Sequence, residues 1–321
     1  MSQPTPAPTK KTNRNFLKTW AIAIIIMLVG LTVLALLRQA SLRSQQAATA
    51  SKSDKLLMTT SFYPVYFLVT RIGGAEIDAR LITPAGAEPH EYEPTPQDIA
   101  LLTDSDLIVL LGGGLEPWAD VVSESVPTLR VANGLMSIEA EEDGQVYPDP
   151  HTWLDPKLMI NSASQIANEL QARIPEHAST FATRMAALEL ELQQLDADFA
   201  SSLANCQKET VVTSHAALGY LAARYDFTQM AIQGLSPDED PSPQQLAKLA
   251  ALVKQQQIEY ILFESLVSPR LAETLAAETD TQTALFNPLE GLTPAEVEAG
   301  ADYFSVQRDN LQTLRVALEC E

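Results

Sequence analysis

Three of the chain's four histidines are the residues best suited to chemistry. His90 lies in Glu-Pro-His-Glu-Tyr-Glu-Pro, His151 in Asp-Pro-His-Thr-Trp-Leu-Asp-Pro and His215 in Thr-Ser-His-Ala-Ala. Neutral imidazole nitrogens bind Zn²⁺ at about 2.0–2.1 Å in tetrahedral sites. A lone histidine of this kind more often packs locally or caps a turn. Three of them in separate segments, two beside rigid prolines and acids, favour one shared metal site.

The acids beside these histidines have two interpretations. A metal-bound imidazole usually donates its second ring N–H to a carboxylate, which fixes the ring and strengthens the donor. Each acid is equally well explained as solvated loop charge. The residues in question are Glu88, Glu91, Glu93, Asp149 and Asp155.

The elements expected to position the histidines form an α/β protein. Short apolar runs predict strands at 56–60, 77–83, 106–111 and 128–132, and a second series at 210–213, 227–232, 258–263 and 283–286. Helical patterns fill most of the gaps, which favours parallel βαβ units. Such sheets bind ligands at the carboxyl ends of their strands. His90 and His151 belong to the first half and His215 to the second, so we expect the metal site in a cleft between two lobes.

One long rigid helix is expected to join the lobes. Apolar residues recur at three- and four-residue spacing between Phe181 and Phe199, which predicts a helix from about Pro175 to Leu203. At about 1.5 Å per residue it would span roughly 40 Å. The expected organisation is an N-terminal segment at 1–54, a lobe at 55–176, the linking helix at 177–204 and a lobe at 205–321. We also expect one helix over 294–318 and a plain surface loop over 139–145.

The charge of the chain is unevenly distributed. Residues 1–54 contain seven of the 21 Lys and Arg residues and one of the 41 Asp and Glu residues. The remainder therefore holds 14 basic and 40 acidic residues, a net charge of −26. A body of this charge repels nucleic-acid phosphates and anionic lipid and attracts cations. We expect no nucleic-acid partner.

The N-terminal segment predicts export. An uncharged apolar run from Thr19 to Leu37 follows four basic residues between positions 10 and 18. Positive charge before such a run orients the N-terminus to the cytoplasm. The run is long enough to span a bilayer, so it is either an anchor or a signal cleaved near Ala48-Thr49-Ala50. The first cysteine of the chain is Cys206, which excludes lipid attachment just after the run. We expect a periplasmic or otherwise extracytoplasmic body.

The cysteine count agrees with export. Cys206 and Cys320 are the two cysteines of the chain. An even count in an oxidising compartment favours a disulfide. Two free thiols are the alternative.

The sequence resembles the metal-binding solute-binding proteins of zinc and manganese ABC transporters, a family also called cluster A-I or cluster IX. The resemblance covers about residues 55–318. Its landmark segments are 88–94 with Pro96 and Asp98, 107–116, 149–156, 214–220, 234–243 and 286–289. The fold that it implies is two α/β lobes bridged by one long helix, in agreement with the pattern of strands and helices.

The resemblance also implies a ligand set. It places His90, His151 and His215 at family ligand positions. Manganese-preferring members carry Glu where this chain has His215, and imidazole suits Zn²⁺ better than Mn²⁺. The family often supplies a fourth ligand as Asp in the segment matching 286–289, where this chain has Asn287. The fourth position is therefore open to Asn287, Glu264, Glu290 or water.

The implied function is capture of Zn²⁺, as the transported ligand, and delivery to an ABC permease. We expect a monomer without catalytic residues, held at the membrane by residues 19–37 if that segment is retained. Manganese binding in the same transporter class is the nearest alternative. A zinc-dependent hydrolase is another, because three histidines and an open position can activate water, but the sequence contains no HExxH motif. An adhesin or structural surface protein is the third.

Overall fold

The computed structural model describes Arg38 and residues 55–142, 145–238 and 241–321. The chain divides between Asp54 and Lys55, and the fold described here is that of residues 55–321. The expected signal or anchor segment at 19–37 and the tether at 39–54 lie outside the described residues. Within the described part, no helix is both long and apolar enough to cross a membrane.

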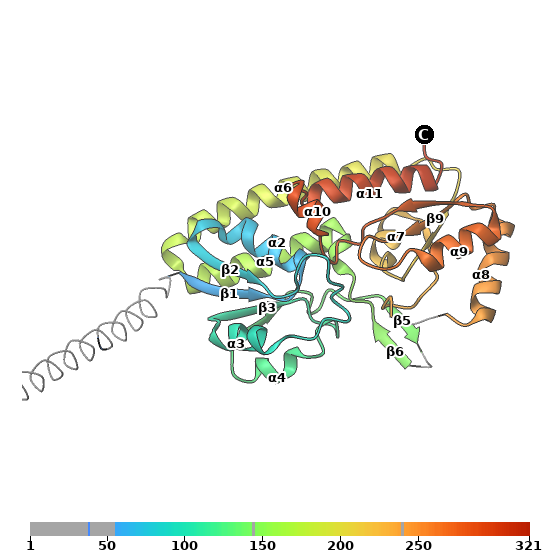
Figure 1. Cartoon of the computed structure of the whole chain (residues 1–321). Coiled ribbons are helices and arrows are strands. Elements are labelled where there is room, and N and C mark those ends of the chain that lie inside the picture. Colours follow the sequence, from blue (N-terminus) through green and yellow to red (C-terminus); the bar gives the residue numbers. More distant parts are fainter. Residues whose placement is uncertain (1–37, 39–54, 143–144, 239–240) are drawn as a thin grey trace, which may run out of the picture. The chain divides into compact units, whose positions relative to one another are not determined.

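The first lobe contains a parallel four-stranded sheet (Figure 1). Its strands are β1 (Leu56–Thr60), β2 (Ile77–Leu81), β3 (Leu107–Leu110) and β4 (Thr128–Arg130), in the order β2-β1-β3-β4. Every residue of β3 is buried, as expected for an inner parallel strand covered on both faces. The helices of this lobe are α2 (Tyr63–Gly73), α3 (Pro96–Asp104), α4 (Ala119–Ser123) and α5 (Pro156–Arg173).

The second lobe repeats this arrangement. Its strands are β7 (Thr210–Thr213), β8 (Thr228–Ala231), β9 (Tyr260–Phe263) and β10 (Gln282–Leu285), all parallel, in the order β10-β9-β7-β8. The connecting helices are α7 (Gly219–Tyr225), α8 (Pro243–Gln256) and α9 (Arg270–Thr279). The expected α/β fold with two parallel sheets is confirmed.

A long helix, α6 (Ala178–Ser202), follows a 3₁₀ turn at Pro175–His177 and connects the lobes. It packs against α2 and α5 of the first lobe and against α11 (Tyr303–Ala317), as Figure 1 shows along the top of the molecule. Its buried side chains form the predicted stripe: Phe181, Met185, Leu188, Leu192, Leu195 and Phe199. One apolar core includes this stripe together with Met58 of β1 and Val211 of β7, so the lobes share a core.

The C-terminal segment differs from the expected single helix over 294–318. It forms α10 (Pro294–Glu298) and α11, which begins only at Tyr303. Between them Gly300 adopts a φ of 72°, a left-handed conformation that favours glycine. Asp302 then caps α11 by accepting the N–H of Ser305. These two local signals end one helix and begin the next.

The stretch expected as a plain loop over 139–145 is instead part of a hairpin. β5 (Glu139–Glu142) pairs antiparallel with β6 (Gln145–Pro148). Two residues separate the paired Glu142 and Gln145, and in the sequence they are Asp-Gly. Asp-Gly between two strand-forming segments is a strong hairpin signal. The flanking residues here are mostly polar, so the sequence does not show the alternation of apolar and polar residues that predicts strands.

The expected disulfide between Cys206 and Cys320 is present. The two cysteines follow α6 and α11, respectively, and their backbones also form an isolated antiparallel bridge. The disulfide therefore ties the C-terminus to the start of the second lobe.

Candidate metal centre

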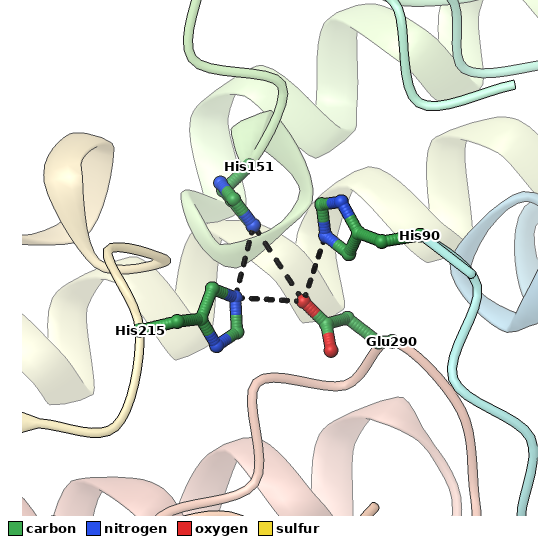
Figure 2. Close-up of side chains that lie close together, drawn as sticks. All are labelled: His90, His151, His215 and Glu290. Atoms are coloured by element: carbon green, nitrogen blue, oxygen red, sulfur yellow. Dashed lines mark hydrogen bonds and ion pairs between the residues drawn. The ribbon is translucent and has the colours of Figure 1, made fainter. Parts of the chain in front are cut away.

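Four side chains from separate loops converge on one point: His90, His151, His215 and Glu290 (Figure 2). One ligand atom of each lies within 4.8 Å of the other three. His151, His215 and Glu290 are buried, and the His90 side chain is 10% exposed. The three histidines singled out in the sequence are thus brought together by the fold.

Three of these four side chains lie in loops that follow the end of a strand in a parallel sheet. His90 lies between β2 and α3, His215 between β7 and α7, and Glu290 between β10 and α10. All three follow strands of parallel sheets, at the carboxyl edge where such sheets bind ligands. His151 differs, because it follows β6 of the hairpin and precedes a 3₁₀ turn at Thr152–Leu154.

Capped helix starts fix the far ends of three ligand loops. Thr95 caps the start of α3 and forms a reciprocal capping box with Asp98. Asp155 caps the start of α5, where its carboxylate accepts two backbone N–H groups. Thr293 caps the start of α10 in the same way as Thr95. A proline follows each cap residue, which sets the backbone for the first helical turn.

Four of the six distances between the ligand atoms are close to the edge length of a zinc tetrahedron, and all six are within 4.8 Å. Glu290 Oε1 lies 3.0 Å from His215 Nε2, 3.3 Å from His90 Nε2 and 3.5 Å from His151 Nε2. The Nε2 atoms of His151 and His215 are 3.2 Å apart. A tetrahedral Zn²⁺ with bonds of about 2.0–2.1 Å separates its ligand atoms by about 3.3 Å. These separations therefore fit a closed four-ligand site.

Several of these atoms are buried without a hydrogen-bond partner among the described residues. They are His90 Nε2 and both carboxylate oxygens of Glu290. Buried polar atoms almost always have a partner, and an exception calls for an explanation such as an ion. Three imidazole nitrogens and one carboxylate oxygen are a donor set that suits Zn²⁺.

Two further carboxylates orient the imidazoles from behind. Asp149 Oδ1 lies 2.8 Å from His151 Nδ1 and accepts the backbone N–H of His151 at 2.9 Å. Glu264, directly after β9, lies 2.8 Å from His215 Nδ1 and accepts the backbone N–H of His215 at 3.0 Å. Each carboxylate favours a proton on Nδ1, which leaves the Nε2 lone pair for a metal. Asp149 was among the acids considered from the sequence for this role.

Burial and charge oppose each other in the metal-free cluster. Burial lowers the pKa of His215, but Glu264 and Glu290 outweigh burial and hold that pKa well above its ordinary value. Burial also lowers the pKa of His151, but the hydrogen bond with Asp149 and the nearby Glu290 carboxylate leave that pKa raised. At His90 burial prevails, and the pKa is lowered.

At Glu290, burial and the neighbouring imidazoles also have opposite effects on the pKa. Burial raises the pKa of this carboxyl group, but the charge of His215 and the close approach of the three imidazoles hold that pKa well below its ordinary value. The cluster therefore presents an ionised carboxylate, and the raised pKa values of His151 and His215 mean that a cation competes with protons at these two rings.

The structure places Glu290 in the cluster, and neither Asn287 nor Glu264 is one of the four converging side chains. Asn287 Nδ2 donates to Glu296 at 2.9 Å, and Asn287 Oδ1 accepts the N–H of Leu289 at 2.8 Å. Leu289 adopts a left-handed φ of 59°, so the chain turns just before Glu290. Of the three protein candidates from the sequence, Glu264 bonds to His215 Nδ1 and Asn287 bonds to Glu296, which leaves Glu290 in the cluster.

The fold and the site together define a class, the solute-binding proteins that hold a divalent metal ion between two α/β lobes. A family model described as zinc-uptake complex component A, periplasmic, matches residues 58–317. The chain belongs to this family.

Named relatives agree with this membership. Zinc-binding protein AdcA of Streptococcus pyogenes is 34% identical over 299 residues, which cover 85% of this chain and 58% of that protein. High-affinity zinc uptake system protein ZnuA of Bacillus subtilis is 32% identical over 291 residues, with 86% and 91% covered. The chain thus spans less than two thirds of the streptococcal relative's length.

A solved structure shows the same fold. The Zn(II)-bound ZnuA-like domain of Streptococcus pneumoniae AdcA is 37% identical to this chain, with a TM-score of 0.72. The match covers 83% of this chain and 99% of that domain.

Proposed function

We propose that this protein captures Zn²⁺ outside the cytoplasmic membrane and passes it to an ABC permease for import. The observation that carries the proposal is the convergence of three histidines on Glu290 Oε1, which lies 3.0–3.5 Å from each Nε2 atom. Zn²⁺ is the cargo of this site. Membership in the zinc-uptake family and similarity to AdcA and ZnuA support the same conclusion.

The donor set favours zinc over manganese. Imidazole is a good ligand for Zn²⁺, whereas Mn²⁺ prefers sites rich in carboxylate and water oxygen. His215 lies at the position where the sequence resemblance assigns Glu to manganese-preferring proteins. Glu290 is the single carboxylate among the four converging side chains.

The same geometry disfavours a zinc-dependent hydrolase. A catalytic zinc keeps an open position for water, whereas Glu290 occupies the fourth corner beside the three histidines. Family membership as a component of an uptake complex agrees with a binding role.

Export and attachment rest on the N-terminal segment. A Streptococcus pneumoniae relative, 36% identical, is named zinc-binding lipoprotein AdcA. In this chain the first cysteine is Cys206, so lipid attachment near the apolar run has no acceptor thiol. We propose that the apolar run at 19–37 directs export and, if it is retained, anchors an extracytoplasmic monomer to the membrane.

Zinc uptake by cells tests this function. The gene for the chain would be deleted from a host that carries the cognate permease, and the wild type or His151→Ala would be restored. We expect the wild type to restore uptake of radioactive zinc at low concentration and His151→Ala to fail. Undiminished zinc uptake in the deletion strain would contradict the proposal.

A further inference from the structure

Helix α7 of the second lobe contacts the residues that flank His151. Tyr220, on this helix, is 4% exposed. Its hydroxyl donates a 2.9 Å hydrogen bond to the carbonyl oxygen of Asp149 and accepts the N–H groups of Ser137 at 3.1 Å and Ile138 at 3.3 Å. A phenol hydroxyl has one hydrogen and two acceptor lone pairs, so these three bonds use its full capacity.

These bonds hold the base of the β5–β6 hairpin together. Ser137 and Ile138 precede β5, and Asp149 follows β6. Asp149 also donates its own N–H to the Ile138 carbonyl at 2.9 Å. The Tyr220 hydroxyl therefore bonds to the chain where it enters the hairpin and where it leaves it.

The neighbouring Gly219 packs against the side chain of the same aspartate. A Cβ atom on Gly219 would lie 2.4 Å from Asp149 Oδ2, closer than two such atoms can approach. The other oxygen, Oδ1, lies 2.8 Å from His151 Nδ1. Any side chain at position 219 would therefore push the carboxylate that orients His151.

Helix α7 also reaches the far side of the His151 segment. Arg224 Nε donates to Asp155 Oδ2 at 2.6 Å. Asp155 is buried and caps α5. The helix that begins four residues after His215 is thus bonded on both sides of His151.

We propose that Tyr220 is a positioning residue for the metal site, which holds Asp149 so that Asp149 can orient His151 toward the ion. The inference rests on the proposed zinc-binding function. The three hydrogen bonds of the Tyr220 hydroxyl all go to backbone atoms, so Tyr220 acts through Asp149. Loss of its hydroxyl leaves the ligand set intact but frees the backbone of Asp149 and the hairpin base. Zinc should then be released faster.

The test compares two tyrosines of the same helix in the full-length protein. Tyr220→Phe removes the hydroxyl described above. Tyr225→Phe is the matched control, because its hydroxyl donates to Asp196 of α6 at 3.2 Å and its ring stacks on Phe199. Zn²⁺ release into excess chelator would be followed by stopped flow. We expect release about 10-fold faster from Tyr220→Phe and within about two-fold of wild type from Tyr225→Phe.

A spectroscopic readout separates positioning from general destabilisation. Co²⁺ bound in place of Zn²⁺ has visible absorption bands that depend on the geometry of its ligands. We expect altered bands in Tyr220→Phe and in Gly219→Ala, since the added methyl group displaces Asp149, and unaltered bands in Tyr225→Phe. A wild-type release rate and wild-type Co²⁺ bands in Tyr220→Phe would overturn the inference, whatever Gly219→Ala shows. Failure of the wild type to bind Zn²⁺ would overturn the proposed function as well.

Discussion

Trp153 Nε1 donates a 2.7 Å hydrogen bond to the carbonyl oxygen of Pro288. Trp153 follows His151 by two residues, and Pro288 precedes Glu290 by two, so this bond joins the loops of two ligands from different lobes. Trp153 is 1% exposed, and its own carbonyl accepts the Tyr303 hydroxyl at 2.7 Å. The loops of His151 and Glu290 are therefore held together by a buried hydrogen bond that needs no metal.

Replacement of Trp153 by Phe should weaken the metal-free protein. The change removes the indole N–H and leaves the Pro288 carbonyl buried without its partner, which costs about 1–3 kcal/mol. The half-buried Trp118 provides a control, because Trp118→Phe should cost less. Urea unfolding of the two variants checks the prediction. An equal loss in the free energy of unfolding in the two variants would mean that the Trp153–Pro288 hydrogen bond does not stabilise the fold.

Glu290→Gln should weaken zinc binding by at least about 100-fold, since it replaces an anionic ligand with a neutral amide. Competition with a chelator of known affinity measures this loss. The histidines and their carboxylate partners are unchanged, so the metal-free protein should still fold, as circular dichroism would show. Wild-type affinity in this variant would remove Glu290 from the ligand set.

Asn287→Asp tests whether residue 287, rather than Glu290, can be the fourth metal ligand. The family resemblance gives Asp at this position, but here the side chain faces Glu296. A second carboxylate would lose the hydrogen bond to Glu296 and face its negative charge. We expect no gain in zinc affinity and a loss of about 1–3 kcal/mol in the free energy of unfolding. Tighter zinc binding in Asn287→Asp would show that residue 287 can reach the ion.

Zinc affinity and metal-free stability should respond oppositely to pH. Although burial opposes it, Glu264 and Glu290 hold the pKa of His215 well above 6.5 in the folded protein. The protonated ring therefore adds stability to the metal-free fold that is complete below about pH 6.5 and lost as pH rises through the folded pKa. The same proton must leave before Nε2 binds zinc, so affinity falls as pH drops through that raised pKa.

Two titrations check these trends. Urea unfolding of the metal-free protein reports the contribution of His215 to stability, and a zinc competition series reports affinity, both from about pH 5 to 9. Glu264→Gln removes one of the carboxylates that raise the pKa of His215, so the loss of affinity should begin at lower pH in that variant. Zinc affinity that stays constant down to about pH 5 would argue against histidine ligation.

The disulfide should stabilise the fold without changing the zinc affinity of the site. Cys206 and Cys320 are separated by 114 residues, and closing a loop of about 100 residues contributes about 2–5 kcal/mol. The double variant Cys206→Ser, Cys320→Ser should lose that amount in urea unfolding. Zinc affinity should stay within about three-fold, because neither cysteine lies in a ligand loop. A loss of affinity beyond ten-fold would reveal coupling between the C-terminus and the site.

Residue types and periodicity were sufficient to predict much of this molecule. The three histidines stood out because each follows a strand or a rigid proline, and the fold brings them together. The stripe from Phe181 to Phe199 has helical spacing, and all six of its members are buried on α6. Both observations depend on local sequence alone.

The remaining features depend on local turns and on contacts between distant segments. The fourth converging side chain is Glu290, and the chain turns just before it at Leu289, whose positive φ has no signature in its residue type. The bond from Tyr220 to Asp149 joins residues 71 positions apart. Composition and spacing contain no information on such a contact.

The most direct test of the central claim is a competition titration of the purified, metal-stripped protein with Zn²⁺ and Mn²⁺. Tight binding of one Zn²⁺ per chain, which excess Mn²⁺ does not displace, is the result that three histidines and Glu290 predict. Preference for Mn²⁺, or no tight binding of either ion, would contradict the account of a zinc-capture site.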